Sequence, residues 1–156
     1  MRTECHVPAG KTLFFPLLNW SAWTPEDLDF ANDLGVPGNT DTEKMRNLLT
    51  EFVDQTFDLQ CTVDGVELQN LDQYRAASSG ATSFVLSDLA GAFGLEPGFR
   101  EILVADGHWL MLTPLSPGEH TIEFSAKMDC AGGDECFGAE FSFDVGPIVY
   151  ELTVDG

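Results

Sequence analysis

The chain has 156 residues, a formal net charge of −19 and 12 phenylalanines, and hydrophobic residues make up 44% of it. This length fits a single domain over residues 1–156, which buries about two-thirds of its unfolded surface and needs no metal to fold. The excess of acids argues against nucleic acid or an anionic membrane as a partner, because like charges repel. No apolar run approaches the roughly 18 residues of a membrane-spanning helix, so we expect no membrane insertion.

A short apolar strand and an aromatic segment make up the N-terminal part of the chain. We predict a strand over residues 12–15, ended by Pro16, and irregular structure over residues 19–23. Trp20 and Trp23 lie in this irregular segment and are candidate ligand-binding residues, since flat aromatic rings stack on sugar rings. The alternative is that both tryptophans pack beneath the helices that follow. Three more aromatic residues belong to the same hypothesis of a sugar-binding platform: Tyr74, Trp109 and Tyr150. For Trp109 the alternative is a place in the core, because it is flanked by leucines.

Residues 24–57 are predicted to form a two-helix insertion. Thr24 and Pro25 begin the first helix as N-cap and first helical residue, and this helix is expected to end near Gly35. Residues 40–43 form a capping box that opens the second helix. The apolar residues of the second helix recur at helical spacing and form one stripe: Met45, Leu48, Leu49, Phe52 and Val53. We expect the insertion to pack on one edge or face of the β structure.

Most of the remaining chain has the short apolar or alternating runs that are typical of strands. Asp64-Gly65 predicts a two-residue hairpin turn, and the Ser-Pro-Gly corner at residues 116–118 predicts another turn. A third turn is expected at residues 105–107. The predicted strands cover residues 57–63, 66–68, 82–86, 100–104, 108–112, 121–128, 140–145 and 148–154. This succession predicts a mainly β protein, an antiparallel β-sandwich of jelly-roll or immunoglobulin-like type.

Four cysteines in a small β domain predict two disulfides. We predict that Cys5 pairs with Cys61 and ties the N-terminal strand to the strand after the insertion, while Cys130 pairs with Cys136 and staples one loop. Two alternatives stay open, a zinc site that uses Cys130, Cys136 and a histidine, and four free buried thiols. Disulfides favour export to an oxidising compartment. The first residues lack the layout of a signal peptide, so we interpret the signal as already removed, with a cytoplasmic protein as the alternative.

Acidic residues and histidines supply the remaining candidates for ligand chemistry. Asp129, Asp134 and Glu135 share the cysteine-bounded loop with two glycines, and hard oxygen ligands on such a loop suit calcium. Calcium is therefore the one cofactor that we consider, against the alternative of ordinary solvated acids. The histidines His6, His108 and His120 are expected at the surface or at strand ends.

Four segments carry a resemblance to known proteins. They are Cys5–Phe15 with Pro16, Cys61–Gly65, Asp106–Leu110 and Leu115–Ile122. Together these segments resemble an uncharacterised family of β-sandwich proteins from environmental bacteria, which are usually predicted to be exported. The resemblance covers most of the chain and rests on turns, strand ends and paired cysteines. It therefore implies a fold and export, but no activity.

The sequence thus predicts an exported binding or structural module with an acidic surface and no catalytic activity. We expect a polysaccharide or a protein as its partner, and a monomer or a homodimer. One alternative is a carbohydrate-active or metal-dependent enzyme with a shallow site near Trp20 and Trp23. Another is an adhesion-like domain stabilised by calcium. No catalytic residue is assigned, because the sequence has no Gly-x-Ser-x-Gly motif and its 26 acids form some close pairs by chance.

Overall fold

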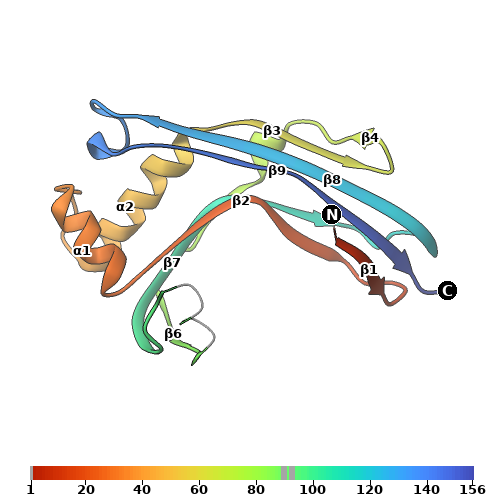
Figure 1. Ribbon diagram of the computed structural model, residues 1–156, viewed down its shortest axis with the longest axis horizontal. Helices are drawn as coiled ribbons and strands as arrows, with labels where there is room; N and C mark the ends of the chain where they lie inside the picture. The colour runs from red at the N-terminus through yellow and green to blue at the C-terminus, as the bar shows by residue number, and fades with distance from the viewer. Residues whose placement is uncertain (1, 89–90, 92–93) are drawn as a thin grey trace.

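Two β-sheets and two α-helices make up the fold, which confirms a mainly β protein (Figure 1). The computed structural model describes residues 2–88, 91 and 94–156. One sheet has the strand order β1-β9-β8-β3-β4, and the other has the order β2-β7-β5, with β6 also paired to β7. The strands are β1 (Arg2–Val7), β2 (Leu13–Trp23), β3 (Thr56–Val63), β4 (Val66–Glu67), β5 (Arg75–Ala77), β6 (Thr82–Leu86), β7 (Gly98–Leu112), β8 (Gly118–Ala131) and β9 (Glu140–Val154). The helices are α1 (Glu26–Asp33) and α2 (Asp41–Asp54), with short 3-10 turns η1 (Leu71–Tyr74) and η3 (Glu135–Gly138).

The main hydrophobic core lies between the two sheets. Strands of both sheets contribute buried side chains to one cluster, which consists of Val7, Leu17, Cys61, Leu71, Leu110, Ile122, Phe124, Leu152 and Val154. In Figure 1 the two sheets form an upper and a lower layer that diverge toward the helices. Among the described residues, the strand pairs are antiparallel except β1 with β9. This parallel pair corrects the prediction of a purely antiparallel arrangement.

The second helix forms as predicted. The Thr40 hydroxyl accepts a hydrogen bond from the Glu43 amide at 3.2 Å, and the Glu43 carboxylate accepts one from the Asn39 amide at 2.8 Å. These contacts satisfy donors that a helix N-terminus otherwise leaves unpaired. The predicted apolar stripe is buried over its full length: Met45, Leu48, Leu49, Phe52 and Val53.

Helix α2 lies between the two layers and α1 packs against α2 and β2, whereas we predicted that the insertion packs on one edge or face of the β structure. Leu48 and Phe52 of α2 pack with Leu18 of β2 and Met128 of β8, so α2 contacts both layers. Figure 1 shows both helices at the end where the layers diverge. The helices thus fill a wedge that the strands alone leave open, which buries the apolar stripe of α2.

Strand β7 runs without a break through residues 105–107, where a turn was predicted. Asp106 is buried, and its carboxylate is held by the Arg75 guanidinium. Gly107 lies against β2, and a Cβ at this position would come within 2.5 Å of the Leu18 carbonyl oxygen. In the dipeptide Asp106-Gly107, the aspartate therefore forms an ion pair and the glycine allows close packing of two strands. The predicted hairpin between residues 100–104 and 108–112 is wrong.

Three further predicted breaks also differ in the structure. Strand β2 continues through Pro16 with a register shift between Pro16 and Leu18, which leaves both Leu17 and Leu18 buried. Strand β9 likewise continues through residues 146–147. The corner at residues 116–118 joins β7 to β8, which belong to different sheets, so it is a crossover between the layers and not a hairpin. Proline and glycine mark irregular positions here, but they do not end the strands at 16 and 146–147.

Candidate functional site

An exposed aromatic cluster occupies the outer side of the β2-β7-β5 sheet. Phe14 pairs with Met111 and Pro16 pairs with Trp109 across β2 and β7, and alternate residues of a strand share one side. The rings of Phe14 and Trp109 stack with centroids 5.4 Å apart and planes 8° from parallel. Phe14, Tyr74 and Met111 are 61%, 50% and 68% exposed. We call the outward side of this sheet, from Phe14 to Trp23 on β2 and from Leu103 to Met111 on β7, the aromatic face.

A shallow hollow lies on the aromatic face beside the stacked rings. Its volume is about 510 Å³, and its lining consists of Phe14, Tyr74, Arg75, Ala76, Ala77, Ser78, Ala105 and Trp109. The lining combines three aromatic rings, those of Phe14, Tyr74 and Trp109, with small alanine and serine side chains. The hollow is thus open and mostly apolar. This shape suits a flat ring that stacks on an aromatic side chain.

The stretch of the aromatic face between β2 and β7 carries no charged side chain, although the chain has 26 acids; Arg75 of β5 lines the hollow, and Glu101 lies on the same side of β7 beyond Leu103. Between Phe14 and Trp23, the residues of β2 on this side are Pro16, Asn19 and Ser21, paired with Trp109, Gly107 and Ala105 of β7. By contrast, the five-stranded sheet exposes many charged side chains along β8 and β9: Glu119, Glu123, Lys127, Asp129, Asp144 and Glu151. Charged side chains are therefore more frequent on the exposed side of β8 and β9 than on the aromatic face. A face with few charges on so acidic a protein suits a neutral partner.

A polar hub behind the hollow fixes the position of β5. Arg75 donates to both carboxylate oxygens of Asp106 at 3.1 and 2.8 Å, to the Thr50 carbonyl oxygen at 3.1 Å, and to Asp54. The hydrogen bonds to Asp106 raise the pKa of Arg75 above its ordinary value, so the guanidinium stays charged. Arg75 therefore ties the end of α2 and strand β5 to β7. Tyr74 precedes Arg75 and is held beside Trp109 in the hollow.

His108 lies in the same hub and is buried, where a strand end or the surface was predicted. Its ring nitrogen Nδ1 is buried and has no hydrogen-bond partner. Burial lowers the pKa of His108, and the nearby Arg75 guanidinium lowers it further, although Asp106 and Asp72 act in the opposite direction. Burial and Arg75 thus favour the neutral form of the imidazole.

Trp20 and Trp23, the candidates named from the sequence, lie in strand β2 and not in an irregular segment. Trp20 faces the helices, and its ring packs edge-on against three phenylalanines. The distances between ring centroids are 5.9 Å to Phe52, 5.9 Å to Phe141 and 6.1 Å to Phe143. The ring of Trp23 packs edge-on against Phe84, with 6.1 Å between the ring centroids. Both indole N–H groups are buried without a partner. Trp20 thus packs beneath α2, as the alternative interpretation predicted, and neither tryptophan lines the hollow.

The other aromatic candidates divide between the hollow and the interior. Trp109 and Tyr74 line the hollow, whereas Tyr150 stacks on Phe124 at 6.0 Å between the sheets. Phe14 was not among the candidates named from the sequence, because its stack on Trp109 depends on the pairing of β2 with β7, which is distant in the chain. The two-residue repeat of side chains along a strand is the one local signal that points Phe14 away from Phe15.

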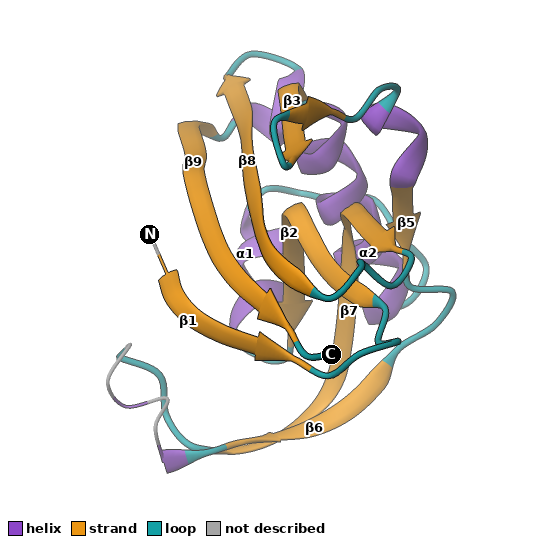
Figure 2. Cartoon of the chain, turned by 90° about the vertical axis from the view of Figure 1, so that its right-hand side faces the viewer, coloured by secondary structure: helices purple, strands orange, loops and turns teal. Residues whose placement is uncertain are grey.

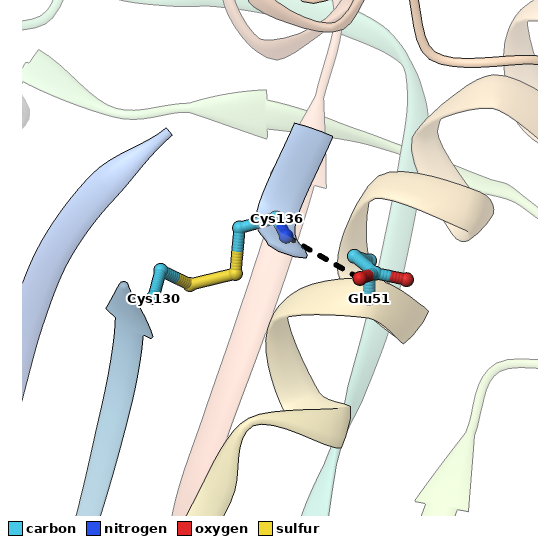
Figure 3. The surroundings of a disulfide bond; sticks show 3 residues. All are labelled: Glu51, Cys130 and Cys136. Atoms are coloured by element: carbon cyan, nitrogen blue, oxygen red, sulfur yellow. Dashed lines mark hydrogen bonds between the residues drawn. A yellow bond between two sulfur atoms is a disulfide. The ribbon is translucent and has the colours of Figure 1, made fainter. Parts of the chain in front are cut away.

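The disulfide between Cys130 and Cys136 is present, as predicted (Figure 3). The amide of Cys136 also donates to the Glu51 carboxylate at 3.3 Å, which ties this loop to α2. The predicted pairing of Cys5 with Cys61 is wrong, because both are free thiols. Strands β9 and β8 lie between β1 and β3, and three strand spacings of about 4.8 Å exceed the reach of a disulfide. Burial raises the pKa of the Cys61 thiol to about 11.

The predicted calcium ligands Asp129, Asp134 and Glu135 do not form a side-chain cluster. Within residues 2–88, 91 and 94–156, no group of three or more His, Cys, Asp or Glu side chains is arranged to hold a metal ion. This finding also gives no support to a zinc site at Cys130 and Cys136, whose sulfurs are bonded to each other.

His120 has a structural role at the crossover between the sheets. Its Nδ1 lies 2.7 Å from the Asp64 carboxylate, and its Nε2 lies 2.8 Å from the Ser116 carbonyl oxygen. Asp64 also accepts a hydrogen bond from the Thr121 amide at 2.9 Å. The hydrogen bond to Asp64 raises the pKa of His120, and the one to Ser116 adds to this effect. The imidazolium form thus clamps the crossover loop to the β3–β4 turn.

No protein-family model matches this sequence, and no curated protein or solved structure is similar enough to match it. What the site can bind is therefore inferred from its geometry alone. In the part of the chain that the structure describes, no helix is both long and apolar enough to cross a membrane.

Proposed function

We propose that this chain is a β-sandwich binding module without catalytic activity, and that its aromatic face binds a neutral polysaccharide. One observation carries the proposal: Phe14, Trp109 and Tyr74 line an open hollow on a sheet face with few charged side chains. A sugar ring has apolar C–H faces, which stack favourably on aromatic rings. Exposed apolar patches of this kind generally mark binding sites.

The neighbouring polar groups and the charge of the molecule support a neutral sugar. Asn19 and Ser21 lie on the same side of β2 as Phe14, where an amide and a hydroxyl can bond to sugar hydroxyls. A net charge of −19 repels anionic polymers such as uronic-acid polysaccharides. The hollow is shallow, and titratable groups do not converge in it as they do in most active sites. These features favour binding over catalysis.

Export and family membership are further parts of the proposal. The Cys130–Cys136 disulfide agrees with an oxidising compartment, where insoluble polysaccharides also occur. We likewise retain the resemblance to exported β-sandwich proteins of environmental bacteria as a hypothesis, supported by two layered sheets that share a core. Mass spectrometry of the protein isolated from the periplasm or medium of its host tests this part directly.

The binding experiment uses a panel of polysaccharides and two alanine variants. Cellulose, xylan, mannan, chitin and β-1,3-glucan are tested against alginate and pectin, by sedimentation with insoluble polymers and calorimetry with soluble ones. We expect binding to at least one neutral polymer, and Trp109→Ala to weaken it about tenfold or more, equivalent to about 1.4 kcal/mol. Phe57→Ala is the matched control, because Phe57 is 50% exposed on the other sheet. Failure of every neutral polymer to bind, or equal loss in both variants, would contradict the proposal.

A further inference from the structure

The two sheets differ in width, which leaves an apolar hollow at one side of the molecule. Strand β2 is the last strand of its sheet, and within the described residues only β7 pairs with it. Figure 2 shows β9 and β1 on the side of β2 opposite to β7. A hollow of about 210 Å³ lies there, lined by Cys5, Leu13, Phe14, Phe15, Ile122, Tyr150 and Leu152. Among the described residues, no strand of this sheet lies on that side of β2, next to the hollow.

A side chain covers the C-terminal end of the β2 edge. At its C-terminal end, the Trp23 amide donates to the Asp27 carboxylate at 2.8 Å, so a side chain covers this part of the edge. At its N-terminal end, Leu13 and Phe15 lie beside the hollow. Edge strands present backbone N–H and C=O groups that template the addition of another strand, and proteins usually block them. The structure shows such a block at Trp23.

We propose that an extended peptide from a partner protein adds to the N-terminal half of β2 as a further strand and inserts an apolar side chain into this hollow. Strand addition combines main-chain hydrogen bonds, which give affinity, with pockets for alternate side chains, which give specificity. A volume of about 210 Å³ is below the roughly 300 Å³ of small-molecule pockets, and it suits one large apolar side chain.

Charge selects the kind of peptide. A chain of net charge −19 attracts basic segments and repels a second copy of itself. The partner segment therefore has apolar residues at alternate positions and lysine or arginine at its flanks. This inference is independent of the polysaccharide proposal. Only Phe14 lines both hollows, so the test leaves Phe14 unchanged.

The test uses a synthetic nonapeptide with alternating leucine and threonine between lysine flanks. One control peptide has the same composition without alternation, and another is N-methylated at the amides that pair with β2. The free thiols supply the readout, because Cys5 lines the hollow and Cys61 is buried with its pKa raised to about 11. We expect the alternating peptide to slow alkylation of Cys5 and amide exchange at residues 13–15 at least tenfold, and both controls to bind at least tenfold more weakly.

Two variants locate the interaction. Cys5→Phe fills the hollow and is expected to abolish peptide binding. His6→Phe places the same ring on the next residue of β1, whose side chain is 70% exposed, and is expected to leave binding unchanged. Equal binding of the control peptides, or full binding by Cys5→Phe, would overturn the proposal. So would a concentration-dependent dimer in sedimentation analysis that Cys5→Phe abolishes, because a second copy would then occupy the edge.

Discussion

His120 and His108 have opposite effects on the way stability depends on pH. His120 gains acceptors on folding, which raises its pKa, whereas burial lowers the pKa of His108. A group with a raised folded pKa stabilises the fold fully below its unfolded pKa of about 6.5, and this contribution is lost as pH rises through the folded value. For a histidine with a lowered folded pKa, stability is instead lost as pH falls below about 6.5. As pH falls, His120 therefore adds to the stability of the fold, whereas His108 lowers it.

For His120, the prediction concerns His120→Gln. The variant loses the imidazolium clamp on Asp64 and Ser116, so the difference in unfolding free energy from wild type is largest near pH 5–6 and shrinks as pH rises toward 9. Urea unfolding at a series of pH values measures this difference. A constant difference from pH 5.5 to 9 would show that His120 does not act through its charge.

For His108, the prediction concerns acid sensitivity. Wild type loses stability as pH falls below about 6.5, because the unfolded chain takes up a proton that the buried ring does not accept. His108→Gln removes this part of the pH dependence, so its stability curve is flatter than that of wild type between pH 6.5 and 5. The same urea series measures the slopes. Equal slopes in both proteins would rule out a buried neutral imidazole.

The Arg75–Asp106 ion pair also contributes to stability, and this contribution can be measured. Arg75→Met leaves the Asp106 carboxylate buried without its partner, and breaking such a pair costs about 3–5 kcal/mol. Differential scanning calorimetry measures the loss. Replacing both partners, with Arg75→Met and Asp106→Leu, should restore part of it. Lys127→Met is the control, because the exposed Lys127–Asp58 pair should matter little. A similar loss of stability in Arg75→Met and Lys127→Met would contradict a stabilising role for the Arg75–Asp106 pair.

At the scale of elements, the sequence predicted those parts whose signals are local. Helix α2 formed with its Thr40 cap and buried stripe, because capping and helical spacing act within a few residues. The Asp64-Gly65 turn formed too, with φ values of 52° and 75°. The same dipeptide at residues 106–107 lies inside a strand. Its carboxylate has a distant partner in Arg75, and its glycine has a close neighbour in β2, and neither fact is visible in the local sequence.

Gly107 supplies the prediction that belongs to this scale. A Cβ at residue 107 would overlap the backbone of β2, so Gly107→Ala forces the strands apart and destabilises the fold by about 1–3 kcal/mol. Gly80→Ala is the matched control, because a Cβ there meets nothing within 4 Å. Thermal unfolding of both variants measures the difference. Equal midpoints would contradict the close approach of β2 and β7.

At the scale of the whole molecule, sheet pairing between distant segments creates the candidate site. The sequence indicated an aromatic sugar-binding platform and included Trp109 and Tyr74 in it, but it favoured Trp20 and Trp23. Strand register decides the outcome: Trp20 pairs with Asp106 on the inner side of β2, and Pro16 pairs with Trp109 on the outer side. Register depends on contacts across about 90 residues of chain, so local alternation alone did not identify Phe14 as the partner of Trp109.

The three tryptophan indole N–H signals in a two-dimensional NMR spectrum report whether a neutral polysaccharide binds to the aromatic face. A soluble oligosaccharide of the polymer that binds is titrated into the labelled protein. We predict that the signal of Trp109, assigned through Trp109→Phe, shifts in a saturable way, while the buried signals of Trp20 and Trp23 stay in place. A saturable shift of Trp20 or Trp23 without one of Trp109 would contradict the account.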